Sequence, residues 1–261
     1  MEEYLEFAID IAKHAGEVML KYFNIDNEAR YKADNTIVTI ADTEINSYLI
    51  DRVKEKYPTH AVDGEEEQFE KSNYVWVCDP IDGTAMYARH IPVAVFSLAL
   101  VIDGEPVVGV VYDPFTDIFY TAIKGKGAYI NGKKMSVNDI QFGDKRSISH
   151  MDVWPACEYN IYDILEELGQ KTYFVSIGTI ARACMCIANG DFNMAICPIT
   201  GHKNCDVAAA KIIVEEAGGK VTNLFGKEQR YDRDVNGVIV SNGLVHQEVI
   251  DIVNKYIESK Y

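Results

Sequence analysis

A short apolar run leads directly into two acids in the stretch Val75-Trp76-Val77-Cys78-Asp79-Pro80-Ile81-Asp82-Gly83-Thr84. The apolar part predicts a buried strand, and the proline makes the chain turn after it. The glycine permits a tight backbone, and Thr84 places a hydroxyl beside Asp79 and Asp82. Two carboxylates held together repel each other unless a cation lies between them, and oxygen donors without thiolate or imidazole neighbours favour Mg²⁺. The stretch therefore predicts a magnesium site at the end of a strand.

The same stretch has a second interpretation as an ordinary surface turn. Asp-Pro-x-Asp-Gly consists mostly of turn-forming residues, and taken alone it supports a turn as well as a site. The apolar strand in front of it favours the site, because α/β folds bind ligands where buried strands end.

Composition excludes several other classes of function. The 261 residues carry a net charge of −15, from 40 acidic and 25 basic side chains, and no block is rich in Lys or Arg. Nucleic acids and membranes are therefore not expected as partners. The start Met1-Glu2-Glu3 has no features of a secretory signal, and no apolar run is long enough to span a membrane. Six scattered cysteines without a CxxC pair indicate a reduced, cytoplasmic setting.

Hydrophobic periodicity divides the chain into two parts. Helical spacing predicts helices over 4–22 and 40–57, and strand patterns follow at 75–79, 93–102, 106–113 and 118–123. Asp103-Gly104 and Asn131-Gly132 are typical of tight turns. Beyond about residue 145, strands and helices alternate: we expect helices at 158–168, 179–189, 206–217 and 244–258, and strands at 172–176, 192–197 and 236–241. The prediction is an antiparallel-rich α+β unit over 1–144 packed against an α/β unit over 145–261.

Three further acids are candidates for the same site, and each has a structural alternative. Glu65 follows a glycine in Gly64-Glu65-Glu66-Glu67 and can supply an oxygen ligand, whereas we expect Glu66 and Glu67 to be solvated. Asp42 in Val38-Thr39-Ile40-Ala41-Asp42 is explained by spacing alone as a first-turn acid behind the N-cap Thr39. Asp206 stands where a helix is expected to begin, and N-capping competes with metal ligation there.

Taken together, these segments resemble the inositol monophosphatase family of Mg²⁺-dependent phosphatases, which belongs with the fructose-1,6-bisphosphatases and the lithium-sensitive nucleotide phosphatases. The matching segments, in order, are Val38-Thr39-Ile40-Ala41-Asp42, Gly64-Glu65-Glu66, Asp79-Pro80-Ile81-Asp82-Gly83-Thr84 and Asp206-Val207-Ala208-Ala209-Ala210 with Glu216-Ala217-Gly218-Gly219. Each is weak alone, but four in this order are highly specific. The resemblance implies a layered αβαβα sandwich of the sugar-phosphatase type, a homodimer, inhibition by lithium, and a small phosphorylated metabolite as substrate.

The resemblance also assigns roles to residues of this chain. It implies that the metal ligands are Glu65, Asp79, Asp82, Asp206 and the carbonyl of Ile81. It implies that Asp42 and Thr84 orient and deprotonate the attacking water. The substrate-binding residues that it implies are Gly83, Thr84, Gly178 and Thr179. The 1–144 unit would carry most of the metal ligands, and the 145–261 unit would supply Asp206 and the substrate pocket.

Several positions depart from the family pattern. An ungapped count places Ile199 where inositol-binding members carry an acid, Cys205 where Trp is usual, and Ile180 where a smaller residue is common. His202 and Lys203 are candidates to meet a second anionic group, although a solvated lysine is the more usual outcome. These departures leave four substrates open: inositol phosphate, fructose 1,6-bisphosphate, histidinol phosphate and 3′-phosphoadenosine 5′-phosphate.

Two other classes of function compete with a phosphatase. A regulatory protein on the same fold would be favoured by a missing ligand or a missing Asp42/Thr84 pair, and all of these residues are present. A glycosidase needs two carboxylates that flank the scissile bond from separate positions, whereas Asp79 and Asp82 lie on one turn. The sequence thus favours a Mg²⁺-dependent phosphoric monoester hydrolase.

Overall fold

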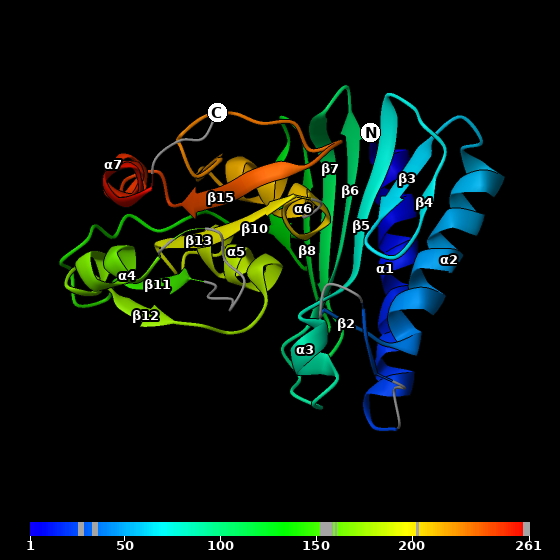
Figure 1. Cartoon of the computed structure of the whole chain (residues 1–261). Helices are drawn as coiled ribbons and strands as arrows, with labels where there is room; N and C mark the ends of the chain where they lie inside the picture. Colours follow the sequence, from blue (N-terminus) through cyan, green and yellow to red (C-terminus); the bar gives the residue numbers. More distant parts are fainter. Residues whose placement is uncertain (26–28, 33–35, 152–158, 160, 202–203, 258–261) are drawn as a thin grey trace.

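A computed structural model of the chain describes residues 1–25, 29–32, 36–151, 159, 161–201 and 204–257. In Figure 1 layers of helices and sheets alternate across the view, from α1 (Glu2–Phe23) and α2 (Ile40–Lys56) at the right, through the large sheet, α6 (Asn204–Glu216) and α5 (Ile180–Ala188), and the smaller sheet, to α4 (Tyr162–Gly169) and α7 (His246–Tyr256) at the left. The αβαβα layering expected from the sequence is therefore confirmed. No helix in these ranges is long and apolar enough to cross a membrane.

The large sheet has eight strands in the order β10-β9-β8-β7-β6-β5-β3-β4. Neighbouring strands are antiparallel except β3 and β5, which run parallel. The strands are β3 (Ala61–Gly64), β4 (Gln68–Phe69), β5 (Tyr74–Asp82), β6 (Val95–Ile102), β7 (Glu105–Asp113), β8 (Ile118–Ile123), β9 (Gly127–Ile130) and β10 (Lys133–Lys134). Both predicted tight turns are present, with positive φ at Asp103-Gly104 and at Asn131-Gly132.

The apolar residues of β5 are buried on both faces of this sheet. Trp76 and Cys78 pack with α1 (Glu2–Phe23) and α2 (Ile40–Lys56) in one core. Val75 and Val77 face the opposite way, into a second core that includes the helices of the middle layer. This two-sided burial explains why the strand is a continuous apolar run instead of an alternating one.

The smaller sheet has five strands in the order β12-β11-β13-β15-β14. They are β11 (Ile148–Met151), β12 (Tyr173–Val175), β13 (Met194–Gly201), β14 (Lys220–Thr222) and β15 (Val235–Ser241). The helices α5 (Ile180–Ala188) and α6 (Asn204–Glu216) fill the space between the sheets, while α4 (Tyr162–Gly169) and α7 (His246–Tyr256) cover the outer face (Figure 1). A hairpin of β1 (Arg30–Tyr31) and β2 (Ile37–Val38) and a short helix α3 (Thr84–Tyr87) complete the described elements.

The small residues after Asp206 allow α6 to approach the large sheet closely. A Cβ atom placed on Gly109 of β7 would lie 3.0 Å from the backbone oxygen of Ala209 and 2.6 Å from Cγ2 of Ile212. Neither partner leaves room for a side chain at position 109, so a glycine on the strand and alanines on the helix fit each other. This contact fixes α6, and with it Asp206, against the sheet that carries the other acids.

Three details of the sequence prediction are wrong. Helix 206–217 begins two residues earlier, at Asn204, so Asp206 lies within the first turn of α6 and is not its N-cap. Strand 75–79 continues to Asp82, because residues beyond the proline pair again with β6 after an irregularity. The short elements β1–β4, β9–β11, β14 and α3 were not predicted. The start of the expected helix 158–168 lies partly outside the described residues, and the unit boundary at 144/145 stays a prediction.

Candidate active site

The two acids of the central stretch lie at the carboxyl end of β5, on either side of a bulge. Asp79 is opposite Ser97 of β6 and Asp82 is opposite Val95, so the register shifts between them. The backbone N–H of Ile81 donates to Asp79 Oδ1 at 2.9 Å, which closes the turn. The side chains of Asp79 and Asp82 are in the protein interior, and the residues are only 3% and 6% exposed. The stretch is therefore not a solvated surface turn.

The glycine after Asp82 is required by both its conformation and its neighbours. Gly83 has φ +94°, and a Cβ there would lie 3.2 Å from both the Gly178 oxygen and the Thr179 Cβ. Gly178 has φ +77° and is itself in contact with Met86 of α3. The predicted substrate-binding segments Gly83-Thr84 and Gly178-Thr179 thus pack directly against each other.

Asp42 performs the structural role expected from its spacing and also faces the site. It forms a capping box with Thr39: its Oδ2 accepts from the Thr39 N–H at 2.8 Å and from the Thr39 hydroxyl at 2.5 Å. Its other oxygen lies 3.4 Å from the hydroxyl of Thr84, which donates to the Ile81 carbonyl at 2.8 Å. Burial is the main reason why the pKa of Asp42 is raised to about 7; the hydrogen bonds from Thr39 oppose this rise, and the negative charges of Glu65 and Glu66 add to it.

Glu65 reaches the same edge of the sheet because β3 and β5 are parallel. Gly64 pairs with Cys78, and the N–H of Glu65 donates to the Cys78 carbonyl at 3.1 Å. The ammonium of Lys32 lies 3.7 Å from Glu65 Oε1 and 2.6 Å from Glu66 Oε1. The sequence analysis missed Lys32, because nothing in a polar loop indicates that one of its lysines returns to the acids. It also expected Glu66 to be solvated, whereas Glu66 is half-buried against this lysine.

Asn46 is a second residue that the sequence analysis missed. It lies one helical turn after Asp42 on α2 and is buried. Its amide nitrogen donates to the Glu67 carbonyl at 3.1 Å, and its amide oxygen accepts from the N–H groups of Glu66 and Glu67 at 3.3 and 3.4 Å. One face of α2 therefore holds both Asp42 and the Glu65 loop, and the i, i+4 spacing of two polar residues was the available signal.

Asp82 is held by hydrogen bonds from the N-terminus of α5, a helix in the layer between the two sheets. Asp82 Oδ2 accepts hydrogen bonds from the Thr179 hydroxyl and, at 2.7 Å, from the Ala181 N–H. Thr179 is the N-cap of α5, and its hydroxyl oxygen accepts from the Arg182 N–H at 3.3 Å. A carboxylate at a helix N-terminus is stabilised by the unpaired N–H groups and the helix dipole. Asp82 thus connects β5 of the large sheet to the start of α5 in the middle layer.

Asp206 comes from the first turn of α6 and is 7% exposed. The thiol of the preceding Cys205 donates to its Oδ1 at 3.1 Å. The side chain of Ile199 and the residues His202 and Lys203, all named in the sequence analysis, lie outside the described part of the structure.

The donor set fits a hard divalent cation. The candidate ligands are four carboxylates and one backbone carbonyl, all oxygen donors, and three of the carboxylates are buried. In the described ranges, however, no three His, Cys, Asp or Glu side chains converge closely enough to hold a metal ion. Two of the contacts that the structure forms here link separate segments: Asp42–Thr84–Ile81 and Asp82–Thr179. The ligand assignments therefore stay predictions, supported by the chemistry and burial of the donors.

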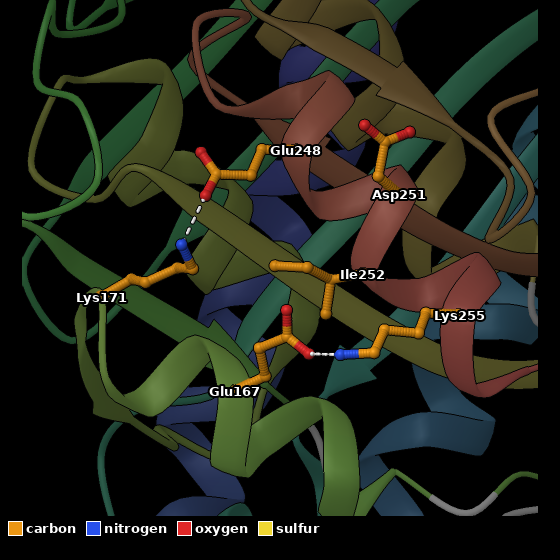
Figure 2. A pocket seen from close by; sticks show the side chains of 6 residues that line it. All are labelled: Glu167, Lys171, Glu248, Asp251, Ile252 and Lys255. Carbon is orange, nitrogen blue, oxygen red and sulfur yellow. Dashed lines mark hydrogen bonds and ion pairs between the residues drawn. The ribbon is translucent and has the colours of Figure 1, made fainter.

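A separate cavity of about 230 Å³ lies on the outer layer between α4 and α7, and Figure 2 shows the side chains that line it. It is bridged by ion pairs of 2.8 Å between Lys171 and Glu248 and of 2.6 Å between Lys255 and Glu167. Exposed pairs of this kind contribute little to stability. None of the predicted site residues lines this cavity.

The fold and the buried acids define the class of protein: an αβαβα sandwich of the sugar-phosphatase type. A solved structure of a Thermotoga maritima IMPase superimposes with a TM-score of 0.88 at 28% identity, covering 98% of both chains. The chain is 36% identical over 240 residues to inositol monophosphatase 1 of Solanum lycopersicum, 87% of each protein. It is 31% identical over 260 residues to a Thermotoga maritima fructose-1,6-bisphosphatase/inositol-1-monophosphatase, 97% of each.

A model of the inositol monophosphatase family matches residues 1–258. The chain therefore belongs to the inositol monophosphatase family, and the family and the curated relatives are phosphatases.

Proposed function

We propose that this protein hydrolyses a small phosphate monoester in a Mg²⁺-dependent reaction. The observation that carries the proposal is the contact chain Asp42–Thr84–Ile81 beside the buried Asp79 and Asp82. This contact chain brings a carboxylate and a hydroxyl together beside further oxygen donors. Phosphoryl transfer to water mainly requires that the water is positioned and that the charge of the phosphate is neutralised.

The metal would be held by Glu65, Asp79, Asp82, Asp206 and the carbonyl of Ile81. When bound, Mg²⁺ neutralises phosphate charge and lowers the pKa of water in the site. The residues of the chain supply position and a proton acceptor. Thr84 and Asp42 orient the attacking water, and a carboxyl group with a pKa of about 7 is well matched to accept its proton near neutral pH. No covalent intermediate with the protein is needed.

The phosphate group would lie against Gly83 and Thr84, beside the place where this segment packs on Gly178 and Thr179. Gly83 and Thr84 would offer backbone N–H groups to its oxygens, at the start of α3. Gly178 and Thr179 would line the part of the pocket that receives the rest of the substrate, because they lie against Gly83. This arrangement sets the phosphate near the carboxylates and the leaving alcohol near α5.

Inositol monophosphate is the substrate that we favour. The Solanum relative is an inositol monophosphatase, and the relative from Thermotoga is named for fructose 1,6-bisphosphate as well. Fructose 1,6-bisphosphate is therefore the second candidate. Ile199 supports broad selectivity over strict recognition of a polyol, since an apolar side chain cannot pair with ring hydroxyls. Histidinol phosphate and 3′-phosphoadenosine 5′-phosphate complete the set of substrates.

The test is a phosphate-release assay with the four substrates, each with Mg²⁺ and with excess chelator. Turnover of inositol 1-phosphate that depends on Mg²⁺ supports the proposal, and faster turnover of another substrate reassigns the metabolite. No turnover of any phosphomonoester would favour a regulatory protein on this fold. A homodimer and inhibition by lithium stay predictions of the family resemblance, and a cytoplasmic setting stays a prediction of the cysteine pattern. Sedimentation analysis and a lithium titration at constant ionic strength test the first two.

A further inference from the structure

We propose that Asp63 and Asn204 form a positioning pair that sets Glu65 and Asp206 relative to each other. The amide nitrogen of Asn204 donates to Asp63 Oδ2 at 2.6 Å, across 141 positions of sequence. The inference rests on the proposed function, because it concerns the distance between two of the predicted metal ligands.

Each partner lies two residues before a predicted ligand. Asp63 is on β3, directly before Gly64 and Glu65, and Asn204 is the first residue of α6, in the turn that contains Asp206. The hydrogen bond therefore ties the end of the strand that carries one ligand to the start of the helix that carries the other. A shift of α6 along the sheet would change the separation of the two carboxylates and break this bond in the same movement.

Both side chains are held by a second partner, so the bond joins two fixed points. Gln68 on the neighbouring strand β4 donates to Asp63 Oδ1 at 2.7 Å. The nitrogen of Asn204 also donates to the carbonyl of Tyr231 at 3.1 Å. Pre-organised ligands bind a metal more tightly, because less freedom is lost when the ion enters.

The two polar atoms of the Asn204 amide are in different situations. Asn204 is fully buried, and its Oδ1 has no hydrogen-bond partner among the described residues. A buried acceptor without a donor is unfavourable. The amide is accounted for by its nitrogen, which donates to Asp63 and to the Tyr231 carbonyl, and the contact with Asp63 is the shorter of the two.

The experiment measures Mg²⁺ binding to the metal-free, full-length protein by calorimetry, without substrate, and unfolding by urea in chelator. The variants are Asn204→Ala, Asp63→Ala, the double variant and Asp63→Asn. The matched control is Asn138→Ala, because the Asn138 amide nitrogen, like that of Asn204, donates to two oxygen atoms. These are the carbonyls of Gly190 and Phe192, at 2.9 and 3.0 Å, near the end of α5 remote from Thr179.

We expect Asn204→Ala and Asp63→Ala each to weaken Mg²⁺ binding about five- to tenfold, the effect of losing one hydrogen bond. The double variant should bind no more weakly than the single variants, since both remove the same interaction. Asp63→Asn should bind nearly as the wild type, because its amide oxygen accepts from Asn204 and the exposed Gln68 can turn its own amide. Asn138→Ala should lower the free energy of unfolding and leave Mg²⁺ binding unchanged.

Two failures are distinguishable. If calorimetry detects no Mg²⁺ binding to the wild type, the metal site is wrong, and with it the proposed function and this inference. Wild-type affinity in Asn204→Ala and Asp63→Ala, with only the unfolding free energy lowered, would overturn the positioning role and leave the proposed function intact. Asp63 is not fully buried, so Asp63→Ala keeps the experiment decisive if Asn204→Ala does not fold.

Discussion

At the scale of single residues, Asp42 combines a structural role with a proposed chemical role. One of its oxygens closes the capping box of α2, and the other faces Thr84. Spacing alone predicted only the cap, because a first-turn acid needs no further explanation. The second role depends on Thr84, which lies 42 residues away. A pattern within one helix carries no information about such a neighbour.

Asp42→Asn should abolish turnover and stabilise the metal-free protein above neutral pH. The folded-state pKa of about 7 lies above the ordinary value of 3.8, so the wild type loses stability as the pH rises through this window. Asparagine keeps an acceptor for Thr39 and carries no charge. Urea unfolding in chelator should show a gain of at least about 1 kcal/mol at pH 8 and a smaller difference at pH 5. If Asp42→Asn is equally or less stable than the wild type at pH 8, the pKa of Asp42 is not raised by burial as described.

The residues missed by the sequence analysis share one property. Lys32 and Asn46 act on the Glu65 loop from a hairpin and from a helix that precede it in the chain. The acids were found because they occur in compact motifs with a proline and glycines, whereas their partners are ordinary polar residues. The spacing on α2 was the one signal for Asn46, and Lys32 is brought to the acids by tertiary packing alone.

At the scale of elements, the N-terminus of α5 orients the last acid of β5. Thr179→Val removes the hydroxyl that both caps the helix and donates to Asp82, so we expect about 1–2 kcal/mol lower stability and weaker Mg²⁺ binding. Thr179→Ser keeps the hydroxyl and should retain both properties. Urea unfolding and calorimetric Mg²⁺ titration of the two variants provide the comparison. Unchanged Mg²⁺ affinity in Thr179→Val would show that Asp82 is positioned without this helix.

The start of α7 contains a buried histidine that should make stability depend on pH. His246 Nε2 and Nδ1 lie 3.0 and 2.9 Å from the hydroxyls of Thr222 and Ser241. Burial lowers its pKa from 6.5 to about 4, with a smaller contribution from nearby lysines. The folded state therefore favours the neutral ring. The contribution of this ring to the stability of the protein is complete above pH 6.5 and is lost as the pH falls towards 4.

The loss reaches up to about 3 kcal/mol at pH 4. His246→Gln has no titrating group at this position, so its unfolding free energy should fall less steeply than that of the wild type between pH 6.5 and 4. Urea unfolding at several pH values checks this. Parallel pH profiles for the two proteins would exclude His246 as the source of the dependence.

Element boundaries were the weakest part of the sequence prediction, and the reason is physical. The start of α6 was placed at Asp206 because aspartate is a favoured N-cap, yet the helix continues back to Asn204. The end of β5 was placed at the proline, which lacks a ladder donor, yet pairing resumes beyond a bulge. In both cases contacts with another element decided the boundary, and local propensity did not.

At the scale of the whole molecule, the layers were predicted from the family resemblance, and the structure gives their physical basis: β5 is buried on both faces, and a glycine of β7 lets α6 lie on the sheet. The candidate site was predicted as a set of acids but not as a geometry, since the acids come from β5, α2, α6 and the loop that follows β3. Order along the chain identifies the family, while the distances between these elements depend on tertiary packing.

Metal binding should stabilise the whole protein, because the proposed ligands come from distant parts of the chain and can surround an ion only when the chain is folded. With Mg²⁺ at one hundred times its Kd we expect the free energy of unfolding to rise by about 2.7 kcal/mol. Asp82→Asn should lose most of this rise and be as stable as the wild type, or more stable, in chelator. Thermal unfolding with Mg²⁺ and with chelator tests both statements. A rise of equal size in Asp82→Asn would place the metal elsewhere.

The most direct test of the central claim is the release of phosphate from inositol 1-phosphate by the full-length protein. We predict that the wild type turns over with Mg²⁺, stops in excess chelator and recovers when Mg²⁺ is added back. Asp82→Asn should show no turnover under any of these conditions. Undiminished turnover in chelator, or by Asp82→Asn with Mg²⁺, would contradict the central claim.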